Sequence, residues 1–230
     1  MKFLDVCSGV GGFRLALEDV GFKCVGAIEN NTKSVQTYNH NFKTTIEPQS
    51  IFDVRDENVP NHDLLCAGFP CQAFSISGKR QGFRDPRGTI IHEIIRIARH
   101  SKPNYILLEN VKNLISHDRG NTLKVIFKMI ADIGYQPSYA VLDSKHFNVP
   151  QSRPRVFIVA IRNDLYKHDF EFPTGNDNYV PMSSILIEGD NSIPISAKWN
   201  TYIDYYSGRL DKNDLWFDLP KTRVALERHP

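Results

Sequence analysis

Short apolar segments with strand character alternate with segments of helical periodicity from Phe3 to Ile161. This alternation predicts an α/β fold of Rossmann-like type, with a mostly parallel sheet covered by helices on both faces. With 230 residues, 41% of them apolar, the chain has enough side chains for a core of that size. The expected strands are 3–6, 23–29, 63–68, 105–108, 140–142 and 156–161; the expected helices include 13–20, 32–42 and 111–133, the last interrupted near 116–121, and an Ile-rich helix after residue 88.

Polar segments follow several of the expected strands directly. They are Ser8 to Gly12, Glu29-Asn30, Pro70-Cys71 and Glu109-Asn110. In a sheet of this kind, ligands bind outside the carboxyl ends of the strands, near the point where the strand order reverses. We therefore expect these segments to build one site.

Composition excludes several classes of protein. The net charge is only +2, so any basic surface for nucleic acid must be local. No apolar run reaches membrane-spanning length, and Met1 is not followed by a signal-peptide layout. No cysteine or histidine pair has zinc-finger spacing. We expect a cytoplasmic protein without a membrane or metal partner.

The character of the sequence changes near residue 175. Periodicity fades after Gly175, and scattered aromatic residues replace it. We therefore expect a catalytic domain over 1–174 and, over 175–230, the start of a region that recognises a target or binds a partner.

The loop after the first strand is of nucleotide-binding type. Glycines from Gly9 to Gly12 let the backbone turn tightly and approach a ligand. Arg14 takes the place of the third glycine of a dinucleotide motif, and Glu29 at the end of the second strand can accept both hydroxyls of a ribose. These features favour S-adenosylmethionine. A simple tight turn or a nicotinamide-dependent Rossmann enzyme are the alternatives.

The segment from Gly68 to Gly78, which contains Pro70-Cys71-Gln72, resembles the catalytic motif of cytosine-5 DNA methyltransferases. Three further stretches agree with that family in order and spacing: Asp5 to Phe13, Leu108 to Val111, and Gln151 to Arg155. The resemblance runs from about residue 2 to residue 173. It implies the fold of an S-adenosylmethionine-dependent methyltransferase.

The resemblance also implies roles for four residues. Cys71 is the nucleophile that adds to carbon 6 of a flipped cytosine, which activates carbon 5 toward a methyl group. Glu109 holds or protonates the ring nitrogen N3, and Arg155, with Arg153 beside it, approaches the cytosine O2. Without the motif, Cys71 would be read as a core thiol, Glu109 as a carboxylate at a helix N-terminus, and the arginines as a solvated pair.

The loop behind Cys71 is basic and rich in glycine. Its position directly after the nucleophile favours a mobile lid that contacts DNA, and an ordinary solvated loop is the alternative. The expected DNA-binding residues are Gln72, Ser75, Ser77, Lys79, Arg80, Arg84 and Arg87.

Matching the family's cofactor site onto this chain predicts a set of binding residues: Cys7, Gly9, Val10, Gly11, Gly12, Glu29, Asn30, Ile51, Pro70 and Ile90. Three positions depart from the common pattern. Cys7 stands where an aromatic residue is frequent, Asn30 where a large side chain is frequent, and Ser50 where the family often has Asp. The departures predict a looser adenine pocket.

Family members normally continue into a target-recognition domain and return to the core with a closing strand and helix. Neither closing motif is found in this sequence. We expect either the catalytic subunit of a split enzyme, completed by a second polypeptide, or a truncated gene product. The expected function is methylation of double-stranded DNA in a restriction-modification system. A tRNA cytosine-5 methyltransferase, a silent DNA-binding or interaction remnant, and a nicotinamide oxidoreductase are the competing hypotheses.

Overall fold

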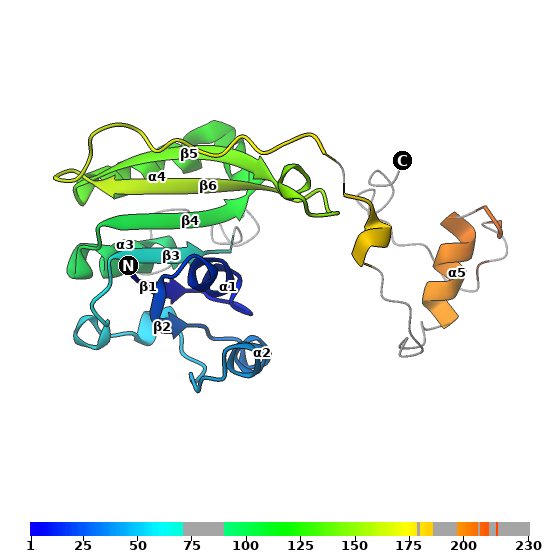
Figure 1. The fold of residues 1–230 in the computed structure, drawn as a ribbon, viewed down its shortest axis with the longest axis horizontal. Helices are drawn as coiled ribbons and strands as arrows, with labels where there is room; N and C mark the ends of the chain where they lie inside the picture. Colours follow the sequence, from blue (N-terminus) through cyan, green and yellow to red (C-terminus); the bar gives the residue numbers. More distant parts are fainter. Residues whose placement is uncertain (71–89, 179, 186–196, 207, 212–214, 216–230) are drawn as a thin grey trace. The chain divides into compact units, whose positions relative to one another are not determined.

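The computed structural model describes residues 1–70, 90–178, 180–185, 197–206, 208–211 and 215 (Figure 1). The chain divides into two compact units, residues 1–184 and 185–230. The described part of the second unit includes one helix, α5 (Ala197–Tyr206). The domain boundary expected near residue 175 stays a prediction.

The first unit is built on a six-stranded sheet with the order β2-β1-β3-β4-β6-β5. Its strands are β1 (Lys2–Val6), β2 (Lys23–Ile28), β3 (Leu64–Gly68), β4 (Tyr105–Val111), β5 (Tyr135–Asp143) and β6 (Pro154–Arg162). Its α-helices are α1 (Gly12–Asp19), α2 (Thr32–Phe42), α3 (Ile90–Ser101) and α4 (Asn121–Asp132). Among the described residues, no helix combines the length and the apolar character needed to cross a membrane.

The sheet is mostly parallel. β2, β1, β3 and β4 run in the same direction, whereas β6 is antiparallel to both β4 and β5. The chain passes from β1 to β2 on one side and later to β3 on the other, so the strand order reverses at β1. The expected fold class is confirmed.

The two faces of the sheet are covered unequally. The larger core cluster joins alternate residues of the strands, such as Leu4 and Ile106, to the isoleucines of α3 and to α4. The opposite face has a much smaller buried cluster, Phe3, Leu64 and Cys66, against which Phe13 and Leu17 of α1 pack. In Figure 1, α1 accordingly lies on the other side of the sheet from α3 and α4.

Beyond α1, this second face carries apolar side chains that are only half-buried. The pairing of β4 with β6 places Tyr105 opposite Ile161, Leu107 opposite Val159 and Glu109 opposite Phe157, all on the face of α1. α1 itself has no fully buried residue, and its Leu15 and Val20 are 69% and 64% exposed. None of the described helices covers the half-buried side chains of β6 on this face. We call the half-buried apolar side chains of β4 and β6 on this face the open face: Tyr105, Leu107, Phe157, Val159 and Ile161.

The helix expected from Val111 onward is wrong in its first part. β4 continues through Glu109 and Asn110 to Val111, because these residues pair with β6 as far as Arg155. Two short 3-10 turns follow, and α4 begins only at Asn121. Tertiary pairing with β6 therefore overrides the local helical pattern. Glu109 is a strand residue, so its reading as a helix N-terminal carboxylate is wrong.

The larger cluster should dominate the stability of the isolated chain. Replacing the fully buried Ile94 of α3 with Ala leaves a cavity and should lower the free energy of unfolding by about 2–5 kcal/mol. Leu15→Ala is the matched control, because this helical side chain is 69% exposed and its removal should change stability by about 0.5 kcal/mol or less. Urea denaturation measures both. Equal losses would show that the two faces contribute alike.

Candidate cofactor and catalytic site

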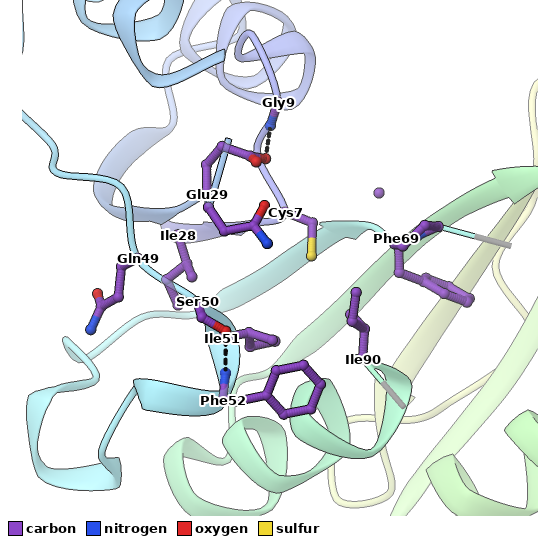
Figure 2. Close-up of a pocket in the computed structure, with 13 residues that line it drawn as sticks. Cys7, Gly9, Ile28, Glu29, Gln49, Ser50, Ile51, Phe52, Phe69 and Ile90 are labelled. Atoms are coloured by element: carbon purple, nitrogen blue, oxygen red, sulfur yellow. Dashed lines mark hydrogen bonds between the residues drawn. The ribbon is translucent and has the colours of Figure 1, made fainter. Parts of the chain in front are cut away.

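A cavity of about 380 Å³ opens at the carboxyl ends of β1, β2 and β3, where the strand order reverses (Figure 2). This volume lies in the range of pockets that hold small organic ligands. Three elements outside the sheet complete it: the loop after α2, the 3-10 turn Ile51–Asp53, and the start of α3. The lining residues are Cys7, Gly9, Ile28, Glu29, Asn30, Gln49, Ser50, Ile51, Phe52, Gly68, Phe69, Pro70 and Ile90.

The loop after β1 needs glycine for two reasons. Gly9 and Gly11 adopt φ angles of 55° and 95°, in the left-handed region that glycine enters without strain. At Gly11, a Cβ atom would also collide with the ring of Phe42 in α2. The loop is closed by a hydrogen bond from the Gly11 amide to the Ser8 carbonyl, 2.9 Å long. Val10 and Gly11 belong to the loop and Gly12 begins α1, but none of the three lines the cavity.

Glu29 is the polar centre of the cavity wall. Its Oε2 accepts a hydrogen bond from the Gly9 amide and its Oε1 one from the Asn31 amide, both 2.8 Å long. A carboxylate offers about four acceptor positions, so these two bonds leave capacity for two further donors. The same side chain can therefore hold the loop in place and accept a pair of ligand hydroxyls.

Apolar side chains form the other walls. Ile51 is buried, whereas Phe52 is 48% exposed and turns part of its ring toward the cavity. The turn that carries them is capped by Ser50, whose Oγ accepts the Phe52 amide at 3.3 Å. Sequence reasoning had selected Ile51 but not Phe52 or Gln49. A serine before an apolar pair is the only local signal for such a turn, and it is a weak one.

Cys7 contributes an inert thiol to this cavity. Burial, together with the negative charges of Glu29 and Asp5, raises the pKa of Cys7 to about 12. The thiol therefore stays protonated at neutral pH and acts as a small apolar group. In Figure 2 its sulfur points toward the side of the cavity formed by Ile51 and Ile90.

Glu109 and Arg155 form an ion pair next to the cavity. The distance from Arg155 Nε to Glu109 Oε1 is 2.8 Å, and both side chains are largely but not fully buried. Arg155 also donates from Nη1 to the carbonyl of Pro154 at 2.9 Å, which orients its guanidinium. Gly68 lies next to the pair, since a Cβ built there would be 3.5 Å from Glu109 Oε2, an ordinary contact distance. Gly68 thus borders both the cavity and the ion pair.

Arg153 is placed differently from Arg155. Its side chain is exposed, and its backbone amide donates to Asp143 at 2.8 Å. Ser152 donates to the same carboxylate at 2.9 Å. The structure therefore brings Arg155, but not the side chain of Arg153, to Glu109.

Asn110 connects β4 to the segment that leads to Cys71. It is 2% exposed, its Nδ2 donates to the carbonyl of Phe69 at 2.8 Å, and its Oδ1 accepts the amide of Val111 at 2.9 Å. The sequence marked this position as a polar strand end, but it gave no partner. The partner directly follows another strand, β3, so no local pattern could identify it.

Several expected site residues lie outside the described residues. They are Cys71, Gln72, Ser75, Ser77, Lys79, Arg80, Arg84 and Arg87. Their roles as nucleophile and DNA contacts stay predictions.

The hydrogen bond from Asn110 to the Phe69 carbonyl should contribute measurably to the free energy of unfolding. Asn110→Leu leaves the Phe69 carbonyl without its donor, which should cost about 1–3 kcal/mol of unfolding free energy. The exposed Asn113 on the following turn is the control, since Asn113→Leu should change stability by about 0.5 kcal/mol or less. Chemical denaturation of the two variants tests this. A neutral Asn110→Leu would show that this hydrogen bond adds nothing to the fold.

Comparison with known proteins agrees with this arrangement. The sequence model of the family described as C-5 cytosine-specific DNA methylase matches residues 1–213. The type II methyltransferase M.HhaI of Haemophilus parahaemolyticus is 45% identical over 173 residues, which are 75% of this chain and 53% of the relative. M.HpaII of Haemophilus parainfluenzae is 39% identical over 206 residues, or 88% of this chain and 57% of the relative.

A solved structure supports the same fold. A DNMT2 variant from Spodoptera frugiperda superposes with a TM-score of 0.68 at 26% identity, covering 83% of this chain and 60% of its own. The chain spans about half the length of the curated relatives it matches. From the family match over residues 1–213 and the identity to these relatives, the chain belongs to the C-5 cytosine-specific DNA methylase family.

Proposed function

We propose that this chain carries the catalytic and cofactor-binding part of an enzyme that methylates carbon 5 of cytosine in DNA. The observation that carries the proposal is the position of Gly68. It lines the cavity at the end of β3, and its Cα borders the ion pair of Glu109 and Arg155. A ligand in the cavity and a base held by Glu109 would therefore be neighbours.

The cavity fits S-adenosylmethionine, which supplies a methyl group activated by a positively charged sulfonium. The two remaining acceptor positions of Glu29 suit the ribose hydroxyls. Ile51 and the partly exposed ring of Phe52 suit the faces of a flat adenine. Gly9 and Asn30 lie at the rim, where the small side chains leave space for the rest of the cofactor.

Cys71 acts as the nucleophile in this proposal. Its thiolate adds to carbon 6 of cytosine, and the electrons of the 5,6 double bond become available at carbon 5. Carbon 5 takes the methyl group from the sulfonium, whose sulfur–methyl bond breaks to leave a neutral thioether. The proton on carbon 5 then passes to a solvent base, and the bond between the Cys71 sulfur and carbon 6 breaks to return the thiolate. Asn110 supports this step, because it fixes the Phe69 carbonyl two residues before Cys71.

Glu109 and Arg155 stabilise the charge that develops on the ring. Glu109 binds N3, and Arg155, which already contacts Glu109 at 2.8 Å, reaches the O2 side of the same base. Arg155 thereby also holds the carboxylate in one orientation. Arg153 is the weaker candidate for contact with the base, because its side chain is exposed.

DNA is the substrate that we propose, within a restriction-modification system. The curated relatives at 39–45% identity are named type II methyltransferases. Inside a duplex, carbon 6 is not accessible to a thiolate and carbon 5 is not accessible to the methyl donor, so the base must be flipped out. The polar and basic residues between Gln72 and Arg87 would contact the DNA phosphates while the base is flipped out.

Covalent trapping tests the nucleophile. With S-adenosylmethionine and any completing partner present, DNA containing 5-fluorocytosine should form a stable adduct with the chain, because fluorine cannot leave as a proton does. Intact-mass measurement should show the adduct, and Cys71→Ala should abolish it. Cys24→Ala is the matched control and should keep it. An adduct that survives Cys71→Ala contradicts the assignment, and an adduct with RNA alone would favour the tRNA alternative.

We also propose that a second polypeptide completes the enzyme and covers the open face. Leu107, Phe157 and Val159 are half-buried on this face, and α1, which packs on the same face through Phe13 and Leu17, exposes Leu15 and Val20. Exposed apolar surface often marks an interface. The relatives contain about as much sequence again as the part that matches this chain. An amphipathic helix with an apolar stripe is the partner that suits a sheet face flanked by α1.

The candidate partner is the product of a neighbouring reading frame that carries the closing motifs. The chain alone should show no methyl transfer to mixed-sequence DNA, and the partner should restore it. Leu15→Glu should weaken the complex at least about tenfold, because it places a charge on an apolar interface. Leu165→Glu, a 38% exposed leucine after β6, should leave binding unchanged. Full site-specific turnover by the isolated chain would overturn the need for a partner.

A further inference from the structure

Asp5 is a buried carboxylate that the proposed mechanism does not use. It lies on β1 opposite Cys66 of β3, which places its side chain on the α1 side of the sheet. The residue is fully buried, and within the described part of the chain neither of its carboxylate oxygens has a hydrogen-bond partner. The Oγ of Ser8, three residues along the same segment, is also buried without a partner among the described residues.

Charged and titratable groups surround Asp5 on each neighbouring element. They are Cys7 after β1, Arg14 of α1, Cys24 of β2, Glu29 directly after β2, Tyr38 of α2 and Cys66 of β3. Arg14 is the one cation among them, and its guanidinium has other contacts. It binds Glu18 at 2.9 Å, reaches the Tyr38 hydroxyl at 3.5 Å, and stacks 4.5 Å from the ring of Phe42.

The backbone of Arg14 does not neutralise Asp5 either. Its amide belongs to the first turn of α1 and favours a negative charge on Asp5, but it does not complete a hydrogen bond to the carboxylate. In the described part of the chain, Asp5 therefore forms no ion pair with a cationic side chain.

The protonation of Asp5 is poised near neutral pH. Burial raises the pKa of this carboxyl to about 7, with Arg14 acting in the opposite direction and Glu29 adding to the increase. The negative charge of ionised Asp5 also acts on a residue of the cavity wall, because it contributes to the raised pKa of Cys7. Cys7 and Glu29, the two groups coupled to Asp5, both line the cavity.

We propose that Asp5 is the residue that makes the cavity distinguish the positively charged sulfonium cofactor from its neutral thioether product. This inference rests on the proposed use of S-adenosylmethionine. The two ligands share adenosine, ammonium and carboxylate groups, so the charge on sulfur is what Asp5 can sense. Coulomb attraction between this charge and a buried carboxylate is weakly screened, so it acts over more than one contact distance.

The sign of the pH dependence follows from linkage. A positive sulfonium near Asp5 favours the ionised carboxylate, so cofactor binding releases a proton from the fraction of Asp5 that is still protonated. Affinity for the cofactor should therefore rise with pH through the region around 7 and level off above it. A single proton limits the slope to about tenfold per pH unit. The thioether product lacks the sulfonium charge, so its affinity should change much less with pH.

Calorimetric titration of the full chain tests this with both ligands between about pH 6 and pH 8. The cofactor should bind about three- to tenfold more tightly at the upper pH, and the product should change less than about twofold. Asp5→Asn keeps the size of the side chain and removes its charge. It should flatten the cofactor's pH dependence and reduce the preference for cofactor over product. Asp19→Asn, at the exposed end of α1, should behave as the wild type.

A second measurement needs no variant. Titrations of the wild type in buffers of different ionisation enthalpy should show proton release with the cofactor near pH 7 and none with the product. Parallel pH dependence for the two ligands, or an unchanged profile in Asp5→Asn, overturns the inference while leaving cofactor binding intact. A chain, with any completing partner, that binds neither ligand would overturn both the inference and the proposed cofactor.

Discussion

The site depends on one carboxylate that joins two strand ends. Glu29 accepts the amide of Gly9 from the loop after β1 and the amide of Asn31 from the start of α2. Both amides belong to backbone that turns sharply and has no strand or helix partner at that point. Glu29 satisfies them and, at the same time, keeps acceptor capacity on the cavity side. The loop is thus shaped before any ligand arrives, which lowers the ordering cost of binding.

The two halves of the site are coupled through β3 and β4. Gly68 pairs with Glu109 across these strands, and Asn110 on the same strand holds the carbonyl of Phe69. A shift of β4 would therefore move the ion pair with Arg155 and the segment before Cys71 together. A Cβ at position 68 would lie in ordinary contact with the Glu109 carboxylate, which shows how close the ion pair lies to the end of β3.

Local sequence was sufficient for much of the fold. The helix over 32–42 has the expected limits, and Gly9, Glu29 and Pro70 from three of the polar strand ends meet in one cavity. Prediction from sequence was wrong or incomplete where contact with another strand decides the secondary structure or the direction of a side chain. Val111 reads as helical but pairs with Arg155 of β6, and Arg153 and Arg155 look equivalent until β6 turns only one of them toward Glu109. Phe52 and Asp5 were missed because cavity walls and burial are properties of the assembled chain.

The open face has a consequence for how the chain is handled in a cell. Among the described residues, α3 and α4 cover one side of the sheet and α1 covers part of the other, so a chain with this arrangement can fold while it still presents apolar surface. Exposed apolar surface also attracts partly unfolded chains, so a chain that depends on the proposed partner would be prone to aggregation and degradation without it. If a second polypeptide covers that face, the steady amount of this protein is set by the supply of its partner. Gene dosage and translation of the two products would then act as a control on methylation, without any change at the catalytic cysteine.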